Sequence, residues 1–294
     1  MQTVLTHSGS FDPDDVLAVA SLEILLGRDN MHIMRSRDSE EISKADWVVD
    51  VGGVYDVSNN RFDHHQPGAP VRDNGIPYSS FGLVWREYGE KICESKEVAE
   101  KMEKKIVQPI DAADNQVALC TCAEHGLKNF EFYDVLQMYK PVWGTHEDYT
   151  TGFLRAVNFG VGLLKRLIAQ FKAEEKMLEY VDEVYKNTED KTILVFDKPV
   201  LREVLTRYED VLVGVSPVTD SEREIWWAAT APKVGNGFDT KALFPEKWAG
   251  LANDKLADVS GIDDATFCHK NRWLFVADTK DGAVTAAKFA EKTK

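Results

Sequence analysis

The chain has 294 residues, 44% of them hydrophobic, and a formal net charge of −14 at pH 7. This length is enough for two domains with sizeable cores. Long duplexes are poor partners for so acidic a chain, because nonspecific duplex binding comes from many Lys and Arg contacts to phosphate. No apolar run approaches the ~20 residues of a membrane helix and no secretory leader is visible, so we expect a cytoplasmic protein with no membrane partner.

Strand and helix patterns alternate through the first half of the chain. Apolar runs predict strands at 2–6, 31–35, 46–51 and 61–64, and helices are expected at 14–26, 79–89, 95–113 and 129–138. Because strands alternate with helices, we predict an α/β fold in which residues 1–149 form a first domain with a mostly parallel, doubly wound sheet.

Residues 150–190 form a predicted helical connector, because apolar residues recur at helical spacing through LLKRLIAQFKAEEKMLEYVDEVY. An interdomain spacer and a dimer-forming helix pair are equally compatible with this pattern, so a homodimer stays open. Residues 191–294 predict a smaller α/β domain with a mixed sheet. Its strands are expected at 192–196, 211–218, 224–230, 265–269 and 273–277, and its helices near 200–208, 254–258 and 282–291.

Acidic and histidine side chains stand where four apolar runs stop. In an open α/β sheet, ligands bind outside the carboxyl ends of the strands, where distant segments converge. Taken singly, a His-His pair is usually a structural accident and a DPDD run is usually a turn before a helix. Together the four segments predict a metal site. Their acidic and histidine residues are His7, Asp12, Asp14, Asp15, Asp50, Asp63, His64, His65 and Asp114.

Imidazole and carboxylate ligands without cysteine suit Mn²⁺, and less well Mg²⁺ or Zn²⁺. The four segments hold more ligands than one ion needs, and a bridging carboxylate would hold two ions ~3.5–4 Å apart. We therefore expect two divalent ions bridged by Asp50. Asp15, already inside the first helix, is expected to be a solvated first-turn carboxylate rather than a ligand.

Two further pairs of side chains have the chemistry to contact a phosphoester. Arg35 and Arg37 flank the end of the second predicted strand, where a guanidinium could bind phosphate or pair with Asp38. Trp226 and Trp227 could stack on bases, although one would face each side of a strand and at least one is expected in the core. The chain has no phosphate-binding GxxxxGK[ST] loop and no GxSxG elbow, so nucleotide-dependent phosphoryl transfer and serine hydrolysis are unsupported.

These motifs carry a family resemblance that extends over nearly the whole chain. The order of the acidic and histidine segments resembles the DHH phosphoesterase superfamily. The segments THSGSFDPDDVLA, DWVVDVGGVYD, NRFDHHQ, PYSSFGLVWREYG and PIDAADN are more closely similar to the Myg (melanocyte-proliferating-gene) family of metal-dependent hydrolases. The similarity continues in LFPEKWAGL, ADVSGIDDATFCH and DGAVTAAKFA.

The resemblance implies roles for individual residues. One ion would be bound by His7, Asp12 and Asp50, with Asp63 close by, and the second by Asp14, Asp50, His64 and Asp114. His65, Asp63 and Arg37 are the expected catalytic residues, with His65 facing the scissile phosphate. Where this chain has Asp12 the Myg family usually has a histidine, which leaves the metal preference open.

The resemblance also implies that residues 1–149 are the catalytic domain, that residues 191–294 grip the substrate, and that the metal site lies in the cleft between the two domains. His269 would contact it, as would Lys270 and Arg272, which stand where the family has a small, Gly-rich stretch. The expected activity is that of a metal-dependent 3′–5′ exonuclease on short single-stranded RNA, with a water activated by two ions. The alternatives are a nanoRNA or cyclic-dinucleotide phosphodiesterase, a pyrophosphatase, or a non-catalytic metal-stabilised binding module.

Overall fold

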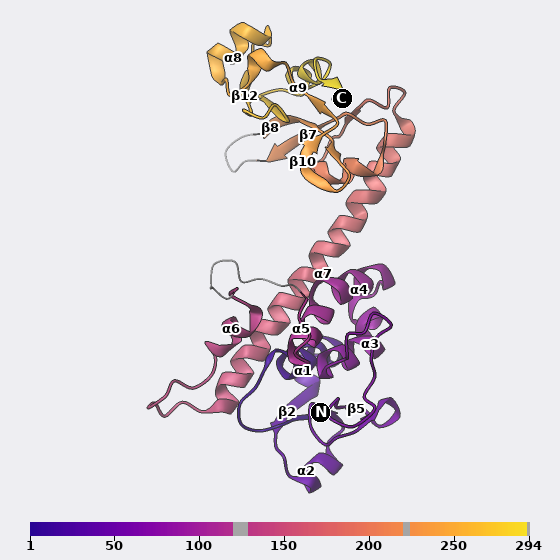
Figure 1. Ribbon diagram of the computed structural model, residues 1–294, viewed down its shortest axis with the longest axis vertical. Coiled ribbons are helices and arrows are strands. Elements are labelled where there is room, and N and C mark those ends of the chain that lie inside the picture. Colours follow the sequence, from indigo (N-terminus) through magenta and orange to yellow (C-terminus); the bar gives the residue numbers. More distant parts are fainter. Residues whose placement is uncertain (120–128, 220–223, 293–294) are drawn as a thin grey trace. The chain divides into compact units, whose positions relative to one another are not determined.

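The structure is a computed structural model that describes residues 1–119, 129–219 and 224–292 (Figure 1). The chain divides into two compact units, Met1–Lys172 and Ala173–Lys294. The division falls inside helix α7 (Tyr149–Asn187), a single helix of 39 residues. The predicted separation into a domain, a connector and a second domain remains a prediction. Within the described residues, no helix is long and apolar enough to cross a membrane.

A five-stranded sheet in the order β2-β1-β3-β5-β4 forms the centre of the first unit. Strand β1 pairs in parallel with β2 and β3, and β3 pairs in parallel with β5, while β4 is antiparallel to β5. The α/β prediction is therefore confirmed. The strands are β1 (Gln2–Thr6), β2 (Met31–Arg35), β3 (Trp47–Val49), β4 (Tyr55–Asp56) and β5 (Arg61–Phe62).

Helices cover both faces of this sheet. Helix α1 packs with α3 and the first half of α7 in the main core, whereas Ile42 of α2 packs on Leu5 and Val48 in a second cluster. Gly160 lets α7 approach α1, because a Cβ there would lie 3.2 Å from Ala20 Cβ. The helices are α1 (Pro13–Leu26), α2 (Ser39–Lys44), α3 (Ser80–Cys93), α4 (Lys96–Met102), α5 (Gln108–Asp114) and α6 (Phe132–Gln137).

The helix predicted over 95–113 is interrupted. A π-helical turn at Glu103–Val107 separates α4 from α5. Pro109 lies at the start of α5 and has no backbone N–H to donate to the preceding turn, which gives the wider turn a physical reason. The helical path still ends at Asp114, so this acidic residue lies at a helix terminus.

The second unit has a mixed five-stranded sheet in the order β12-β13-β8-β7-β6. Among the strand pairs that the structure describes in this sheet, only β6–β7 is parallel. The strands are β6 (Ile193–Val195), β7 (Val213–Thr219), β8 (Glu224–Thr230), β12 (Ala265–Cys268) and β13 (Leu274–Ala277). Two short ladders pair β9 (Pro232–Lys233) with β10 (Asn236–Thr240), and β11 (Ala242–Leu243) with β14 (Glu291–Lys292).

Alternation along β8 directs its two tryptophans to opposite faces of this sheet, as predicted. Trp226 packs towards the core under α8 (Asn253–Ser260) and α9 (Lys280–Ala287). Trp227 packs on the other face with Leu274 and Val276 of β13. The helix expected near 200–208 is a 3₁₀ helix at Arg202–Arg207, and its Val204 and Leu205 pack with the end of α7.

Candidate metal centre

Three neighbouring parallel strands each deliver a polar residue directly after their last residue. His7 follows β1, Asp50 follows β3 and Asp63 follows β5. Because these strands lie side by side in the order β1-β3-β5, the three side chains share one edge of the sheet, and all three are buried. Asp50 has a φ of 57°, a left-handed conformation that aspartate tolerates better than most residues, and it opens the turn through Gly52 and Gly53.

The first turn of α1 adds two carboxylates to this edge. Asp14 is 1% exposed and Asp15 is 0% exposed. Asp15 accepts a hydrogen bond from the backbone N–H of Asp12 through Oδ1, and its Oδ2 lies 3.3 Å from Nε2 of His7. The expectation that Asp15 would be solvated is therefore wrong, because α1 is buried from its first turn onward.

Asp50 lies at the centre of the cluster. Its Oδ2 is 3.2 Å from Nε2 of His7, and its Oδ1 is 3.4 Å from Nε2 of His64. The same Oδ1 is 3.6 Å from Nδ1 of His65 and accepts a hydrogen bond of 3.1 Å from Ser80 Oγ at the start of α3. The two oxygens of one carboxylate thus face different histidines, which is the geometry that a bridging ligand needs. Sequence reasoning did not single out Ser80, although it lies in the PYSSFG motif.

His64 joins the end of α5 to the first turn of α1. Its Nε2 lies 3.4 Å from Oδ2 of Asp114 and 3.8 Å from Oδ2 of Asp14. Among the described residues, three groups have ligand atoms close enough to hold an ion. They are His7/Asp15/Asp50, Asp14/His64/Asp114 and Asp50/His64/His65.

The electrostatics of these groups fit a divalent cation. Burial, followed by the charges of Asp50 and Asp114, raises the pKa of Asp14 well above its usual value. Burial raises the pKa of Asp15 to about 7, although the nearby His7 acts to lower it. Burial likewise raises the pKa of Asp114 to about 6, although His64 acts to lower it. In addition, Oδ2 of Asp14 and Oδ2 of Asp15 are buried without a hydrogen-bond partner among the described residues. Buried, crowded carboxylate oxygens of this kind are stabilised by a metal ion.

The pKa of Asp50 is lowered, whereas the pKa values of His7 and His64 are raised. Burial alone would raise the pKa of Asp50, but hydrogen bonds from His64 and His7 lower it below its usual value. Burial would lower the pKa values of His7 and His64, but the hydrogen bond of each to Asp50 and the nearby carboxylates raise them. The raised pKa values favour the protonated forms of His7 and His64 beside these carboxylates.

Asp63 organises the loop that carries the two histidines. Its Oδ2 accepts from the backbone N–H of Gly53 at 2.5 Å, and its Oδ1 accepts from that of His64 at 2.7 Å. The Nδ1 of His65 is also 2.7 Å from Oδ1 of Asp63. With its oxygens engaged in this way, Asp63 holds the ring of His65, whose side chain is 63% exposed.

Asp12 lies at the margin of the cluster. It is the N-cap residue of α1, its side chain is 46% exposed, and its Oδ1 lies 3.3 Å from Nζ of Lys140. Lys140 lies close to the rings of Phe11 and Tyr133. Asp12 belongs to none of the three groups found within the described residues. Sequence reasoning did not identify Lys140, which lies 128 residues further along the chain.

A cavity of about 470 Å³ opens over these residues, and it is lined by His7, Asp14, Asp50, His65 and Asp114 among others. Asp12 and Arg37 line it too, and Arg37 Nε donates a 3.4 Å hydrogen bond to the carbonyl of Ser8. Arg35 is not among the lining residues. Its guanidinium donates to the carbonyl of Gly9 at 2.9 Å and lies over the ring of Phe153, so it supports the loop after β1.

The residues of the second unit that the sequence predicts to contact substrate, His269, Lys270 and Arg272, lie in the turn between β12 and β13. The backbone N–H of Arg272 donates to the carbonyl of His269 at 2.7 Å, and that of Asn271 donates to Nδ1 of the same histidine at 3.1 Å. Arg272 donates through Nη1 to the carbonyl of Phe244, and Lys270 is exposed. The described contacts therefore fix the His269 ring within the turn and leave Lys270 facing solvent.

Comparisons with known proteins agree on one family. Residues 3–290 match the MYG1 exonuclease family, described as an uncharacterised protein family (UPF0160). The MYG1 protein of Chlamydia pneumoniae is 31% identical over 98% of this chain and 96% of its own length. The MYG1 exonuclease of Homo sapiens is 29% identical over 96% of this chain and 84% of its own length. Among solved structures, a pGpG-specific phosphodiesterase covers 94% of this chain and 92% of its own, but at 12% identity and a TM-score of 0.34 it supports no argument.

Proposed function

The chain belongs to the MYG1 exonuclease family, and from this premise we propose that it is a metal-dependent phosphodiester hydrolase, a 3′–5′ exonuclease that acts on short single-stranded RNA. The observation that carries the proposal is the position of Asp50, whose two carboxylate oxygens face His7 on one side and His64 on the other. A single carboxylate shared by two clusters of ligands is what a pair of ions requires.

The proposed ligand sets follow the clusters. His7, Asp15 and Asp50 would hold one divalent ion, and Asp14, His64 and Asp114 would hold the other. Asp50 would be shared with the second set because its Oδ1 lies 3.4 Å from Nε2 of His64. Mn²⁺ suits these nitrogen and oxygen donors, and Mg²⁺ or Zn²⁺ are the alternatives. When bound, such ions lower the pKa of a coordinated water towards neutrality and offset the charge of the phosphate.

The remaining residues of the cavity would act on the substrate. His65 is the candidate to stabilise charge on the phosphoryl oxygens, because its exposed ring is held by Asp63 at the rim of the cluster. Arg37 lines the same cavity and supplies a guanidinium for a phosphate oxygen. Asp63 would be a positioning residue, since its oxygens are engaged by two backbone N–H groups and by His65.

Short single strands are the proposed substrates, because the acidic chain offers little to a long duplex. A nanoRNA or cyclic-dinucleotide phosphodiesterase and a pyrophosphatase are alternatives within the same chemistry. A metal-stabilised module that binds without turnover is the alternative outside it.

The proposal is tested with RNA oligomers labelled at the 5′ end. After chelation, added Mn²⁺ should restore a ladder of products shortened from the 3′ end. DNA oligomers, a cyclic dinucleotide and pyrophosphate, assayed in parallel, separate the alternatives. Full activity in a verified metal-free sample would overturn the metal-dependent mechanism, and binding of every substrate without products would leave the non-catalytic module.

A further inference from the structure

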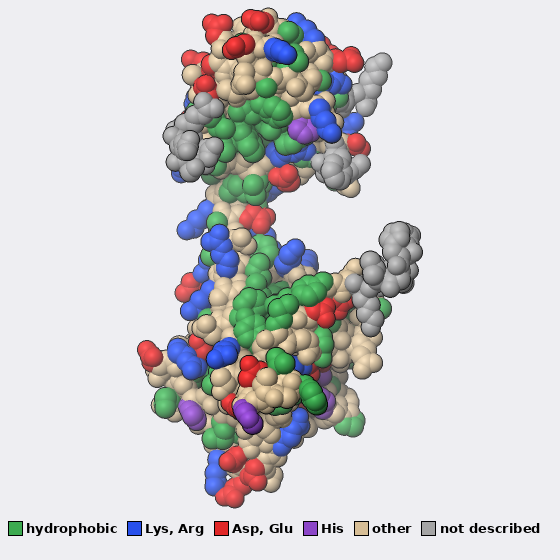
Figure 2. Space-filling model, turned by 90° about the vertical axis from the view of Figure 1, so that its left-hand side faces the viewer, with side chains coloured by type: hydrophobic (Ala, Val, Ile, Leu, Met, Phe, Trp, Pro, Cys, Tyr) green, Lys and Arg blue, Asp and Glu red, His purple; other side chains and the backbone are tan. Residues whose placement is uncertain are grey.

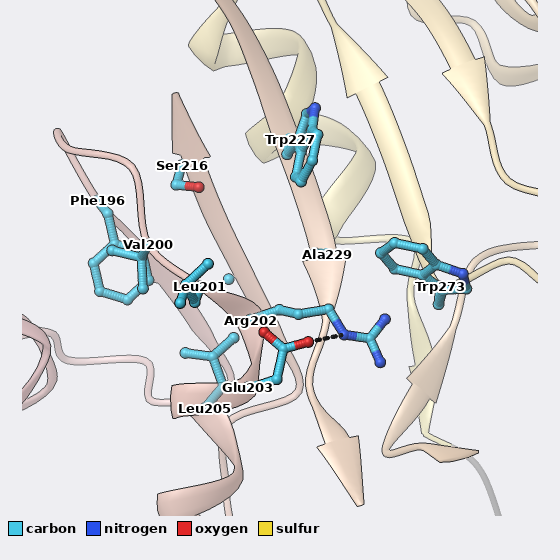
Figure 3. A pocket seen from close by; sticks show the side chains of 11 residues that line it. Phe196, Val200, Leu201, Arg202, Glu203, Leu205, Ser216, Trp227, Ala229 and Trp273 are labelled. Atoms are coloured by element: carbon cyan, nitrogen blue, oxygen red, sulfur yellow. Dashed lines mark ion pairs between the residues drawn. The ribbon is translucent and has the colours of Figure 1, made fainter. Parts of the chain in front are cut away.

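The second unit contains its own cavity, of about 170 Å³, on the face of the sheet opposite α8 and α9. Strands β7 and β8 form its floor through Ser216 and Trp227, and Leu201, Arg202 and Trp273 form its walls (Figure 3). Hydrophobic side chains gather at the surface of this unit (Figure 2). A mostly apolar cavity with a few polar groups is the usual form of a small-ligand site.

Packing leaves this part of the sheet face open. On the same face, the end of α7 and the 3₁₀ helix at Arg202–Arg207 cover β6, where Leu194 is fully buried. Over β8 and β13, Trp227 and Trp273 are only partly buried. The two indoles therefore present ring surface to a ligand at the margin of the packed region.

Arg202 gives the cavity a cation with a flat face. Its guanidinium carbon lies 4.3 Å from the ring centroid of Trp273, and its side chain is 14% exposed. Glu203 lies 3.7 Å from its Nε. A guanidinium stacked on an indole offers both a planar surface and hydrogen-bond donors, which suits an aromatic heterocycle with carbonyl or ring-nitrogen acceptors.

The adjoining turn extends this surface. The ring of His269 lies 5.1 Å from that of Trp273 and 6.3 Å from that of Phe267, so three aromatic rings follow one another. Phe267 is 38% exposed. The turn from His269 to Trp273 carries Lys270 and Arg272 and has no acidic residue, in a chain whose acidic residues outnumber its basic ones 49 to 35.

We propose that this cavity, defined by Trp227, Trp273 and Arg202, is a nucleobase-binding subsite. The inference rests on the proposed function in that it takes the occupant to be a nucleotide. Successive aromatic rings beside cationic side chains are the arrangement that binds single strands without reading their sequence. This local surplus of positive charge favours a nucleotide over a neutral apolar segment of a partner protein.

The test measures binding without turnover. A short single-stranded RNA carrying 2-aminopurine is titrated onto the full-length protein in EDTA, and a strand of the same length with abasic positions serves as the second probe. The base-carrying strand should bind about 10-fold more tightly or better, since stacking contributes ~1–3 kcal/mol per base. Its fluorescence should be quenched on binding.

Variants locate the effect. Trp273→Leu and Arg202→Gln should remove most of the difference between the two strands, while Trp273→Phe should keep part of it. Trp143→Leu is the matched control, because Trp143 is 98% exposed and belongs to the first unit. Arg202→Gln retains all the rings, so it remains informative if Trp273→Leu does not fold.

Failure of this inference differs from failure of the proposed function. Base-dependent binding in a protein that hydrolyses nothing would support the subsite alone. Equal binding of the two strands, or variants that bind like the control, would overturn the subsite even if RNA is hydrolysed, and would leave an apolar partner segment as the occupant of the cavity.

Discussion

The Nδ1 atom of His65 lies 2.7 Å from Oδ1 of Asp63, and the same oxygen accepts the backbone N–H of His64. The carboxylate therefore holds the ring that we propose to act on the substrate, and it also holds the loop that carries the proposed ligand His64. Hydrogen-bond partners of this kind set the tautomer and orientation of a histidine.

We expect His65→Ala to lose kcat by about 100-fold or more while it keeps most of its metal. Asp63→Asn should lose about 10- to 100-fold, because an amide holds the imidazole less strongly. Metal analysis and steady-state kinetics on the same preparations check both. If His65→Ala loses an ion, the ring is a ligand, as the Asp50/His64/His65 group would also allow.

A second prediction concerns the shared carboxylate. Asp50→Asn preserves the shape of the side chain and tolerates the left-handed backbone, but an amide is a poor bridging ligand. We expect fewer than two ions per chain and a kcat/KM lowered by more than about 100-fold. Asp29→Asn, at an exposed position, is the matched control. Two ions retained at full occupancy in Asp50→Asn would contradict the bridging role.

The strand-end residues could be predicted from the sequence because their signal is local. An apolar run that stops at His7 or Asp50 marks the carboxyl end of a strand, and the order of parallel strands places such ends together. The burial of Asp15 could not be predicted in this way. It depends on α3 and α7 enclosing α1, and those contacts join residues far apart in the chain.

The distinction between local signals and long-range contacts also explains other differences between the predicted and the observed structure. The ion pair between Asp12 and Lys140 spans 128 residues and leaves no local pattern. The π-helical turn at Glu103–Val107 did have a local signal in Pro109, which the helical periodicity of 95–113 outweighed. The predicted contacts of Arg35 with phosphate compete with its hydrogen bond to Gly9, a choice that only the packing of the loop after β1 decides.

The third prediction is a pH dependence of the metal-free protein. In the folded state burial raises the pKa of Asp15 to about 7 and that of Asp114 to about 6, whereas the ordinary value is 3.8. At a pH between the unfolded-state and folded-state pKa values, the two carboxyl groups stay protonated in the folded state but are ionised in the unfolded state. The free energy of unfolding therefore falls as the pH rises from about 4 to about 7. The pKa of His7 is also raised in the folded state, so protonation of its ring stabilises the fold. This stabilisation is lost as the pH rises through the folded-state pKa of His7.

Metal should reverse this trend, because ions bind the deprotonated ligands. The stabilisation by Mn²⁺ should therefore grow with pH. Melting temperatures with EDTA and with Mn²⁺ at pH 5, 6, 7 and 8 measure both effects, and Asp15→Asn should flatten the slope of the metal-free series. A melting temperature in EDTA that rises steadily from pH 5 to pH 7 would show that the pKa values of Asp15 and Asp114 are not raised in the folded state.

The last prediction decides between Asp12 and Asp15 as the ligand that accompanies His7. Family resemblance places Asp12 in the metal shell, but its carboxylate is 46% exposed and paired with Lys140, whereas Asp15 is buried with Oδ2 3.3 Å from His7. We expect Asp15→Asn to lose one ion. Asp12→Ala should keep both ions and lose only about 1 kcal/mol of stability, as an N-cap residue does.

Two further variants separate charge from ligation. Lys140→Met removes the ion pair of Asp12 and keeps its carboxylate. If that carboxylate then binds an ion, the affinity for Mg²⁺ should rise relative to the affinity for Mn²⁺, because a carboxylate is a harder ligand than an imidazole. Asp12→His introduces the residue usual in the family and should shift the preference towards Mn²⁺ or Zn²⁺. Bound metal, melting temperature and the Mg²⁺/Mn²⁺ activity ratio are measured for all four proteins. Loss of an ion from Asp12→Ala with full occupancy in Asp15→Asn would return Asp12 to the metal shell and leave Asp15 as the residue that caps the backbone N–H of Asp12.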